Sequence, residues 1–360
     1  MKKIMINAYT NLNLGDDLFI KILIERYPNT KFILYAPKKY KEIFKNNKNI
    51  KIYNKDNIVY RAFDLIFRQL RLNFTIKDLI ANKANAIVKI GGSIFIQNKG
   101  WNIKNISRSL IPKRKPIFVI GANFGPYTDE NFYKFHYNLF QNYTDVCFRD
   151  SKSRDLFKDL NNVRQADDVV FQLEGVKTLY SKNSIVISVI KPSIRDSLKE
   201  YDNIYYNKLK DIITYYVNNN YTVNMLSFCC NEKDDEAIKK IKNLLPDKIK
   251  KHVKGNYYNG DINNFLEIIS SAKYVIATRF HAMILGWVYN KPVFPICYSE
   301  KMNNVLNDVN FEGLKTDLDL INHLTIKDVI EGMEKNLINI DCSINNSTNQ
   351  FLKLDKYINM

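Results

Sequence analysis

The sequence has few of the residues from which metal sites and disulfide frameworks are built. It contains five cysteines and four histidines in 360 residues. The cysteines are odd in number and none has paired CxxC spacing, so neither a disulfide framework nor a zinc site is expected. Cys147 and Cys297 lie inside apolar runs, where we interpret them as small buried hydrophobes. The histidines are scattered along the chain, and we therefore predict no metal.

Several sequence motifs and long apolar runs are also absent. Neither GxGxxG nor GxxxxGK[ST] occurs, which argues against a dinucleotide fingerprint and a P-loop. No apolar run approaches the roughly 18 residues of a membrane-spanning helix. The run that follows Met1-Lys2-Lys3 is too short for the core of a signal peptide. We expect a cytoplasmic protein.

Charge is abundant and unevenly placed. The chain carries 54 Lys and Arg against 37 Asp and Glu, a formal net charge of +17. Residues 1–120 hold 24 basic and 7 acidic residues, whereas the remaining chain holds 30 of each. A composition biased toward Lys, Asn, Ile and Tyr explains high basicity but not this asymmetry. The first third is expected to attract a polyanion or an anionic membrane surface through a field that salt screens.

Apolar strand-like runs alternate with helical patterns along the chain, which predicts an α/β protein with doubly wound sheets. Strands are expected at 4–8, 31–36, 51–54, 85–90, 116–120, 145–148, 166–173, 184–190, 223–228, 274–277 and 292–297. We predict an N-terminal Rossmann-like domain over residues 1–177, a C-terminal one over 184–337, and a loose tail or final helix over 338–360. A lysine-rich piece at 239–254 is interpreted as a solvated helix face and loop.

One predicted helix, at 61–74, is both basic and amphipathic. Phe63, Phe67, Leu70 and Phe74 fall on one face, and arginines lie on the opposite face. Such a helix can lie in a membrane interface. The alternative, a helix that turns its apolar face to the core, is preferred on general grounds.

The richest functional signal lies between residues 274 and 308. A strand at 274–277 is followed directly by Arg279 and His281, and the strand at 292–297 is followed by Tyr298 and Lys301. The carboxyl ends of parallel strands meet at one edge of a sheet, where the next helix's N-terminus attracts anions. The pattern predicts a shared pocket for an anionic ligand. A lone histidine at a helix start can also be only a capping or packing residue.

Weaker signals occur at other strand ends in the first half. Asn13, Gly15 and Asp16 precede a helix that Asp16 or Asp17 is placed to cap. Gly91 and Gly92 follow a strand, where glycine lets the backbone approach a ligand. Arg149 follows another strand and either binds an anion or forms a structural pair with Asp150, with Ser151 capping the next helix.

Taken in order, these motifs resemble those of the polysaccharide pyruvyltransferase family. The matching residues are Asn13-x-Gly15-Asp16, Gly91-Gly92, Gly125-Pro126, Arg149-Asp150, Asp167, Arg279-x-His281, Lys291-Pro292-Val293 and Tyr298-x-x-Lys301. Two positions depart from the family pattern: Asn290 and Ser93 stand where the family usually has glycine. The resemblance implies two Rossmann-like domains that face a cleft, as in glycosyltransferase-B enzymes. It also implies transfer of a pyruvyl group from phosphoenolpyruvate to a sugar as a cyclic ketal.

The reaction so implied makes definite demands on the site. Phosphoenolpyruvate carries a phosphate and a carboxylate, for which Arg279, Lys301, Tyr298 and Arg149 are the candidate ligands. His281 is the candidate general acid, or otherwise a phosphate ligand, and Asp16 is the candidate base. The acceptor is expected on the first domain near Asn13, Gly15, Gly91 and Gly92. No cofactor is required besides the donor substrate.

Two further expectations concern partners and alternatives. If the acceptor is linked to polyprenyl diphosphate, the basic first third of the chain would hold the enzyme on the inner face of the cell membrane. A nucleotide-sugar-dependent glycosyltransferase would use a similar cleft, and a non-enzymatic polyanion-binding protein would explain the basic third alone. Nucleic acid is not expected as a partner.

Overall fold

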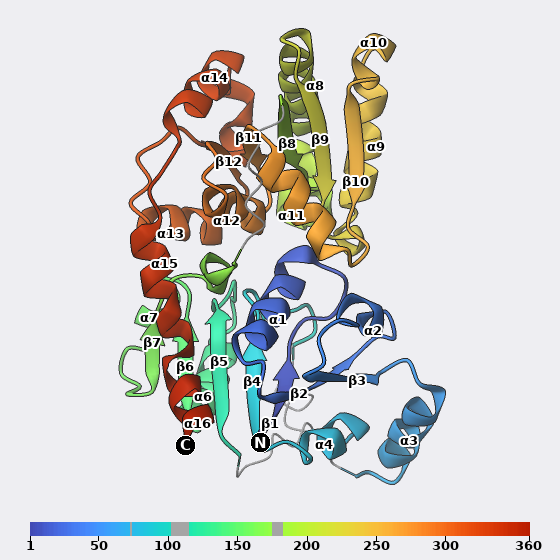
Figure 1. Ribbon diagram of the computed structural model, residues 1–360, viewed down its shortest axis with the longest axis vertical. Helices are drawn as coiled ribbons and strands as arrows, with labels where there is room; N and C mark the ends of the chain where they lie inside the picture. The colour runs from blue at the N-terminus through green and yellow to red at the C-terminus, as the bar shows by residue number, and fades with distance from the viewer. Residues whose placement is uncertain (73, 102–114, 175–182) are drawn as a thin grey trace. The chain divides into compact units, whose positions relative to one another are not determined.

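The protein folds into two α/β units. A computed structural model describes residues 1–72, 74–101, 115–174 and 183–360 (Figure 1). Unit 1 comprises Met1–Asn11, Leu18–Gln172 and Ile344–Met360. Unit 2 comprises Leu12–Asp17 and Leu173–Ser343. The predicted end of the first domain at residue 177 lies outside the described residues.

Unit 1 is built on a parallel sheet of seven strands in the order β3-β2-β1-β4-β5-β6-β7. The strands are β1 (Lys3–Asn7), β2 (Lys31–Ala36), β3 (Ile50–Asn54), β4 (Ala86–Ile90), β5 (Ile117–Ala122), β6 (Asp145–Phe148) and β7 (Val163–Gln165). The central strands are apolar runs whose residues are buried, as expected for a sheet covered on both faces. The strand order reverses between β1 and β4, so loops on either side of this point diverge.

Short helices and connecting turns complete unit 1. Its described helices are α1 (Leu14–Arg26), α2 (Tyr40–Ile43), α3 (Ile58–Gln69), α4 (Ile76–Ala81), α6 (Glu130–Phe140), α7 (Ser151–Asp155), the 3-10 helix η1 (Val169–Gln172) and, near the C-terminus, α15 (Asp341–Ser347), η6 (Thr348–Phe351) and α16 (Leu352–Asn359). The first turn of α1 groups with unit 2, and the rest of the helix groups with unit 1. An aromatic core that includes Phe124, Phe140 and Phe157 packs beside β5 and β6.

Unit 2 repeats the same construction with a parallel sheet in the order β10-β9-β8-β11-β12-β13. Its strands are β8 (Ser184–Ser188), β9 (Thr222–Ser227), β10 (Val253–Tyr257), β11 (Tyr274–Ala277), β12 (Val293–Cys297) and β13 (Thr316–Asp317). Its α-helices are α8 (Asp202–Asn218), α9 (Asp234–Leu244), α10 (Asp247–Lys250), α11 (Ile262–Ser271), α12 (Phe280–Val288), α13 (Glu300–Asp308) and α14 (Ile326–Lys335), and its 3-10 helices are η2 (Pro192–Ile194), η3 (Asp196–Tyr201), η4 (Cys230–Glu232) and η5 (Leu318–His323). Here the strand order reverses between β8 and β11.

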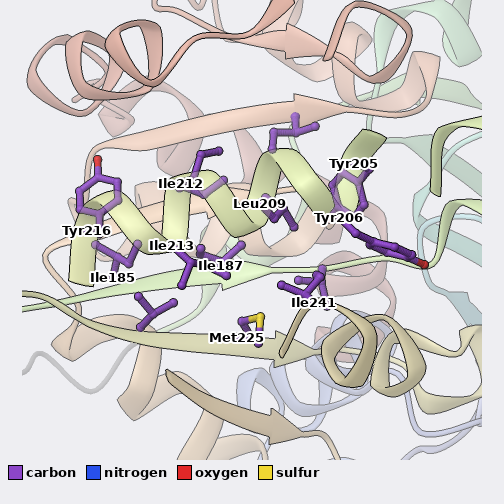
Figure 2. Packing of buried hydrophobic residues seen from close by; sticks show 14 of the residues in the cluster. Ile185, Ile187, Tyr205, Tyr206, Leu209, Ile212, Ile213, Tyr216, Met225 and Ile241 are labelled. Atoms are coloured by element: carbon purple, nitrogen blue, oxygen red, sulfur yellow. The ribbon is translucent and has the colours of Figure 1, made fainter. Parts of the chain in front are cut away.

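In the core of unit 2, the apolar face of helix α8 packs on the sheet. Tyr205, Leu209, Ile212 and Tyr216 recur along one side of α8 and are buried. Figure 2 shows this side of α8 lying over β8 and β9, where Ile185, Ile187 and Met225 face it. Fully burying a side chain of this size contributes about 1.5–3 kcal/mol. The packing holds β8, and with it the strand end described below, in a fixed position.

One sequence prediction about the fold is wrong, and a second is wrong in part. No strand forms at 166–173: β7 ends at Gln165, Asp168 Oδ1 accepts from Val170 N in a turn, and Val169–Gln172 is the 3-10 helix η1. The lysine-rich piece at 239–254 begins in a helix, as predicted, but its last two residues begin the edge strand β10, which pairs with β9. Of the two alternatives predicted for the C-terminal tail, a loose segment and a final helix, the structure has the final helix α16, and the segment before it is anchored.

The anchor of the tail is Gln350, which is fully buried. Its Oε1 accepts from Gly121 N at 2.8 Å, and its Nε2 donates to Ala166 O at 2.7 Å. Gly121 lies at an irregularity in the pairing of β5 with β6, where a backbone N–H loses its ladder partner. Gln350 therefore satisfies backbone groups that the sheet leaves over, and the tail becomes part of unit 1.

Within the described residues, no helix combines the length and apolar character needed to cross a bilayer.

Candidate active site

Arg279 lies where the strand order of unit 2 reverses. It follows β11, whose neighbour β8 ends at Ser188. Ser188 Oγ accepts from the backbone N–H groups of Thr278 and Arg279, each at 3.0 Å. In open α/β sheets the carboxyl ends of strands at such a reversal form the ligand crevice. The strand predicted at 274–277 is therefore confirmed, and the turn after it is pinned to the neighbouring strand.

The Arg279 guanidinium is buried and ion-paired. Its Nε donates to Asp234 Oδ2 at 3.0 Å, its Nη1 donates to Glu232 Oε2 at 2.7 Å, and its Nη2 contacts Asp234 Oδ1. Burial opposes the charged form, but Asp234 and Glu232 outweigh burial and raise the pKa of Arg279. Each terminal nitrogen of the Arg279 guanidinium, Nη1 and Nη2, has a second N–H group that takes no part in these ion pairs. Arg279 is thus first of all a scaffold residue that ties β11 to the start of α9.

Asp234 and Glu232 are in turn fixed by other groups. Asp234 Oδ2 also accepts from Phe228 N at 3.1 Å and from Cys229 N at 3.0 Å. Burial raises the pKa of Glu232, but Arg279 and Arg195 outweigh burial and lower it to about 2. Burial outweighs Arg279 at Asp234 and raises the pKa of that carboxyl to about 6. Both pKa values lie below 7, so both groups are mainly carboxylates at neutral pH and together balance two of the positive charges nearby.

Two further cations surround Tyr298. Arg195 donates from Nη2 to Glu232 Oε2 at 2.6 Å, and its guanidinium carbon lies 4.6 Å from the centroid of the Tyr298 ring. Lys301 Nζ lies 5.8 Å from the same centroid. Burial raises the pKa of the Tyr298 phenol, yet Lys301, Arg195 and Arg279 overcome burial and lower it. The phenol therefore reports a positive potential, which favours an anionic ligand.

Buried donors near Tyr298 have unused hydrogen-bonding capacity. Within the described part of the chain, Arg195 Nη1 and Ser299 Oγ are inaccessible to solvent and contact no hydrogen-bond partner. Ser299 precedes α13 and makes no side-chain cap to it. Buried polar groups are normally satisfied, so a ligand carrying several oxygen acceptors would complete both.

His281 lies at the start of α12 and faces the first turn of α1. The residues from Phe280 to Trp287 are buried except His281, which is partly exposed. A Cβ on Gly15 would fall 1.8 Å from His281 Nδ1 and 2.5 Å from its Cε1, so any other residue would force the ring or the backbone to shift. Asn13 Oδ1 accepts from Gly15 N at 3.0 Å, and Leu14 N donates to Phe228 O at 3.1 Å. The Asn13–Asp16 motif thus packs against the His281 ring.

This grouping corrects the predicted domain assignment of the motif. Asn13, Gly15 and Asp16 were expected on the first domain, but residues Leu12–Asp17 group with unit 2. Asp17 is fully buried and accepts from the Tyr258 hydroxyl at 2.7 Å through Oδ2, which fixes the first turn of α1. Asp16 is partly exposed on that same turn. The candidate acid and the candidate base therefore belong to one unit.

Arg149 and the glycine pair form a separate, closed cluster in unit 1. Arg149 is 2% exposed, and it donates from Nη1 to Asp168 Oδ2 at 2.9 Å and from Nη2 to Asn123 Oδ1 at 2.7 Å. A Cβ on Gly92 would fall 2.5 Å from Arg149 Nη1. Gly91 has φ 140°, a conformation that favours glycine. The structural interpretation of Arg149 is favoured over the anion-binding one.

Arg149 forms an ion pair with Asp168. One detail of this cluster differs from the prediction. Asp150, and not Ser151, caps α7, because its Oδ1 accepts from Ser153 N at 2.8 Å. Gly91 and Gly92 serve the backbone and the packing of Arg149, and a role for them in acceptor binding stays a prediction.

Sequence reasoning missed Arg195, Ser188, Glu232 and Asp234. A signal existed for the last two, since an acidic series directly follows the predicted strand at 223–228. Nothing in the spacing marked Arg195, which lies in a segment of 3-10 turns. Among the described residues, no group of three His, Cys, Asp or Glu side chains is arranged to hold a metal ion.

The family model named polysaccharide pyruvyl transferase matches residues 13–300. The chain belongs to this family. The match begins at Asn13 and ends at Glu300, so it includes the His281 turn and Tyr298 and stops one residue before Lys301. Membership makes the protein a transferase enzyme, as the resemblance of its motifs implied.

Solved structures of other proteins share the fold of this family member at low sequence identity. S. aureus MnaA in a co-structure with UDP is 12% identical, with a TM-score of 0.62, covering 100% of this chain and 97% of that one. The UDP-GlcNAc 2-epimerase of Neisseria meningitidis, bound to UDP-GlcNAc, is 11% identical, with a TM-score of 0.61, covering 99% and 100%. Anabaena HepE, in complex with UDP and glucose, is 12% identical, with a TM-score of 0.56, covering 100% of both chains. The predicted glycosyltransferase-B-like fold of two Rossmann-like units is thereby confirmed.

Proposed function

We propose that the enzyme transfers the pyruvyl group of phosphoenolpyruvate to a sugar of a cell-surface polysaccharide precursor, forming a cyclic ketal and releasing phosphate. The observation that carries this proposal is the positive potential at Tyr298, created by Lys301, Arg195 and Arg279 at the strand reversal of unit 2. In this cluster three cations face the two carboxylates of Glu232 and Asp234, which leaves one positive charge in excess. That excess favours an anionic donor.

The donor's two anionic groups have distinct candidate ligands. Lys301 is a point charge suited to phosphate, and Ser299 Oγ together with Arg195 Nη1 supplies donors that lack protein partners in the described chain. The two N–H groups of Arg279 that lie beyond its ion pairs are additional donors for the carboxylate. Tyr298 lies between these groups and orients the donor through its phenol.

The reaction needs one proton delivered to carbon and two protons removed from oxygen. His281 gives a proton to the methylene carbon of phosphoenolpyruvate, which makes the adjoining carbon electrophilic. A sugar hydroxyl attacks that carbon and loses its proton to Asp16, which lies one residue from the glycine that contacts His281. The carbon–oxygen bond to phosphate then breaks, a second hydroxyl closes the ketal, and its proton leaves with the phosphate. Asp16 returns its proton to His281 through solvent, so atoms, protons and charges balance over one turnover.

The acceptor is the less constrained half of the proposal. We infer a saccharide carried on a polyprenyl diphosphate at the inner face of the cell membrane, because such a substrate gives a purpose to the basic first third of the chain. Gly91, Gly92 and Asn13 remain candidates for acceptor contacts.

Thermal stability with added ligand tests the donor half directly. A ligand at a hundred times its dissociation constant adds about 2.7 kcal/mol to stability. Phosphoenolpyruvate is expected to raise the Tm of the native chain and of the control Lys248→Met, which removes an exposed lysine from α10, but not that of Lys301→Met. Stabilisation by UDP-sugars with no response to phosphoenolpyruvate would overturn the proposal in favour of a nucleotide-sugar glycosyltransferase.

A further inference from the structure

Helix α3 is held to unit 1 by one narrow side. Tyr60, Asp64 and Phe67 lie at helical spacing on that side. The Tyr60 ring lies 6.5 Å from that of Tyr35, Asp64 Oδ1 accepts from Ile76 N at 2.7 Å, and the Phe67 ring lies 4.8 Å from that of Phe74. No residue of α3 is buried. The helix is therefore attached but not covered. The expectation that it turns its apolar face to the core holds for Phe67, which packs against the core of unit 1, but not for Phe63 and Leu70, which are exposed.

The rest of the apolar surface of α3 faces outward as a stripe. The stripe consists of Val59, Ala62, Phe63, Ile66 and Leu70, which recur at spacings of three and four residues. Val59 is 52% exposed, Phe63 46%, Ile66 45% and Leu70 64%. Ile58 and Leu72, at the two ends of the helix, extend it. Single exposed apolar residues are normal, but a continuous stripe of this kind marks an interaction surface.

Basic residues accompany the stripe. Arg61 and Arg68 are exposed on the side of α3 away from the stripe, and exposed Arg71 follows the helix. Acidic residues are scarce here, with Asp64 tied to Ile76 N. This combination of an apolar face with large aromatic and aliphatic side chains and a cationic polar face is typical of helices that lie in a membrane interface. Figure 1 shows α3 at the edge of unit 1, beside α4.

We propose that α3 docks unit 1 on an anionic lipid bilayer, with the stripe entering the acyl boundary and the arginines contacting phosphate headgroups. Charge decides between a bilayer and a second copy of this chain. A second copy of this chain carries the same excess of positive charge and would be repelled at long range, whereas anionic headgroups attract it. The 24 basic against 7 acidic residues of positions 1–120 strengthen that attraction at low salt. The inference deepens the membrane location given above and does not rest on the donor chemistry.

Sedimentation with vesicles tests the inference on the full chain. The native chain is expected to pellet with vesicles of phosphatidylcholine and phosphatidylglycerol, and not with phosphatidylcholine alone. The double variant Phe63→Ser/Ile66→Ser should bind at least tenfold more weakly, while Leu320→Ser, which removes an apolar residue 54% exposed in unit 2, should bind like the native chain. Arg61→Gln/Arg68→Gln should weaken binding and reduce its dependence on salt.

Two outcomes would overturn this inference. Undiminished binding by Phe63→Ser/Ile66→Ser would show that charge alone recruits the chain. A native dimer that this variant abolishes, without any vesicle binding, would make the stripe a contact between copies. Because the substituted side chains are exposed, the variant Phe63→Ser/Ile66→Ser should fold like the native chain. If phosphoenolpyruvate still raises the Tm of this variant, a negative vesicle result counts against membrane docking by α3 and not against the proposed donor.

Discussion

Substitution of Gly15 by alanine should disable the enzyme through His281. The added Cβ would lie 1.8 Å from Nδ1, whereas ordinary contacts begin near 3.4 Å, so the ring or the turn must move by about 1.6 Å. Because Leu14 N and Gly15 N are both held by hydrogen bonds, the turn cannot yield without losing them. A misplacement of about 1 Å can cost roughly 100-fold in rate. Turnover is therefore expected to fall at least about 100-fold, with a loss of stability of about 1–3 kcal/mol from overpacking.

A double-mutant cycle distinguishes this cause from general damage. Phosphate release from phosphoenolpyruvate is measured with a saccharide acceptor for the native chain, Gly15→Ala, His281→Ala and the double variant, and stability is measured by urea denaturation. His281→Ala alone should lose about 100- to 10,000-fold as a missing general acid. Adding Gly15→Ala to it should then cost little, because the clashing ring is gone. Full activity in Gly15→Ala, or losses that simply multiply, would refute the reasoning.

Three further predictions concern charge. Arg279→Ala should destabilise the chain by about 3–5 kcal/mol in urea denaturation, because it leaves Asp234 buried without its cation. A smaller loss of stability in the double variant Arg279→Met/Asp234→Asn would support that cause, and an equal loss would contradict it. Arg279 and Arg195 lower the pKa of Glu232 from 4.5 to about 2, so the ionised carboxylate stabilises the fold above pH 4.5. The free energy of unfolding should fall by up to about 3 kcal/mol as the pH falls from 4.5 toward 2. In Glu232→Gln this pH dependence of the free energy of unfolding should be weaker. Burial, with a smaller contribution from Lys77, lowers the pKa of Lys89 from 10.5 to about 8. Lys89→Met should therefore be more stable than the native chain by up to about 3 kcal/mol at pH 7. This difference should shrink between pH 8 and 10.5, where Lys89 is protonated in the unfolded state only.

The sequence was sufficient for most of the fold because both sheets are parallel and buried. Strands covered on both faces are written as continuous apolar runs, and those at 31–36, 145–148 and 274–277 are found at the predicted bounds. Edge strands lack this signal, which is why β10, with Lys254 and Gly255, was not recognised. The anchoring of the tail was not foreseen for another reason: Gln350 is buried because it satisfies backbone groups of Gly121 and Ala166, and that requirement exists only once β5 and its bulge have formed.

Arg279 and His281 lie at the predicted strand end, but their contacts were not foreseen. A strand end at a reversal of strand order can be anticipated from the alternation of elements, and Arg279 and His281 do lie there. Asp234 and Glu232, the partners of Arg279, lie 45 and 47 positions before it in the sequence. Gly15, which contacts the His281 ring, is separated from His281 by most of the chain. Such pairings depend on tertiary packing, which local patterns do not record.

The same comparison changes how arginines in these motifs should be interpreted. Arg149 and Arg279 are the two most conspicuous motif cations, yet both are buried against carboxylates, with Asp168 holding one and Asp234 and Glu232 the other. Removing either would expose a buried charge, so loss of activity in Arg279→Ala would not by itself identify a substrate ligand. Lys301 forms no ion pair with a carboxylate in the described part of the chain, and its ammonium lies over the rings of Tyr298 and Phe280. Variants of Lys301 should therefore separate binding from folding, and the proposed donor site is better tested at Lys301 than at Arg279.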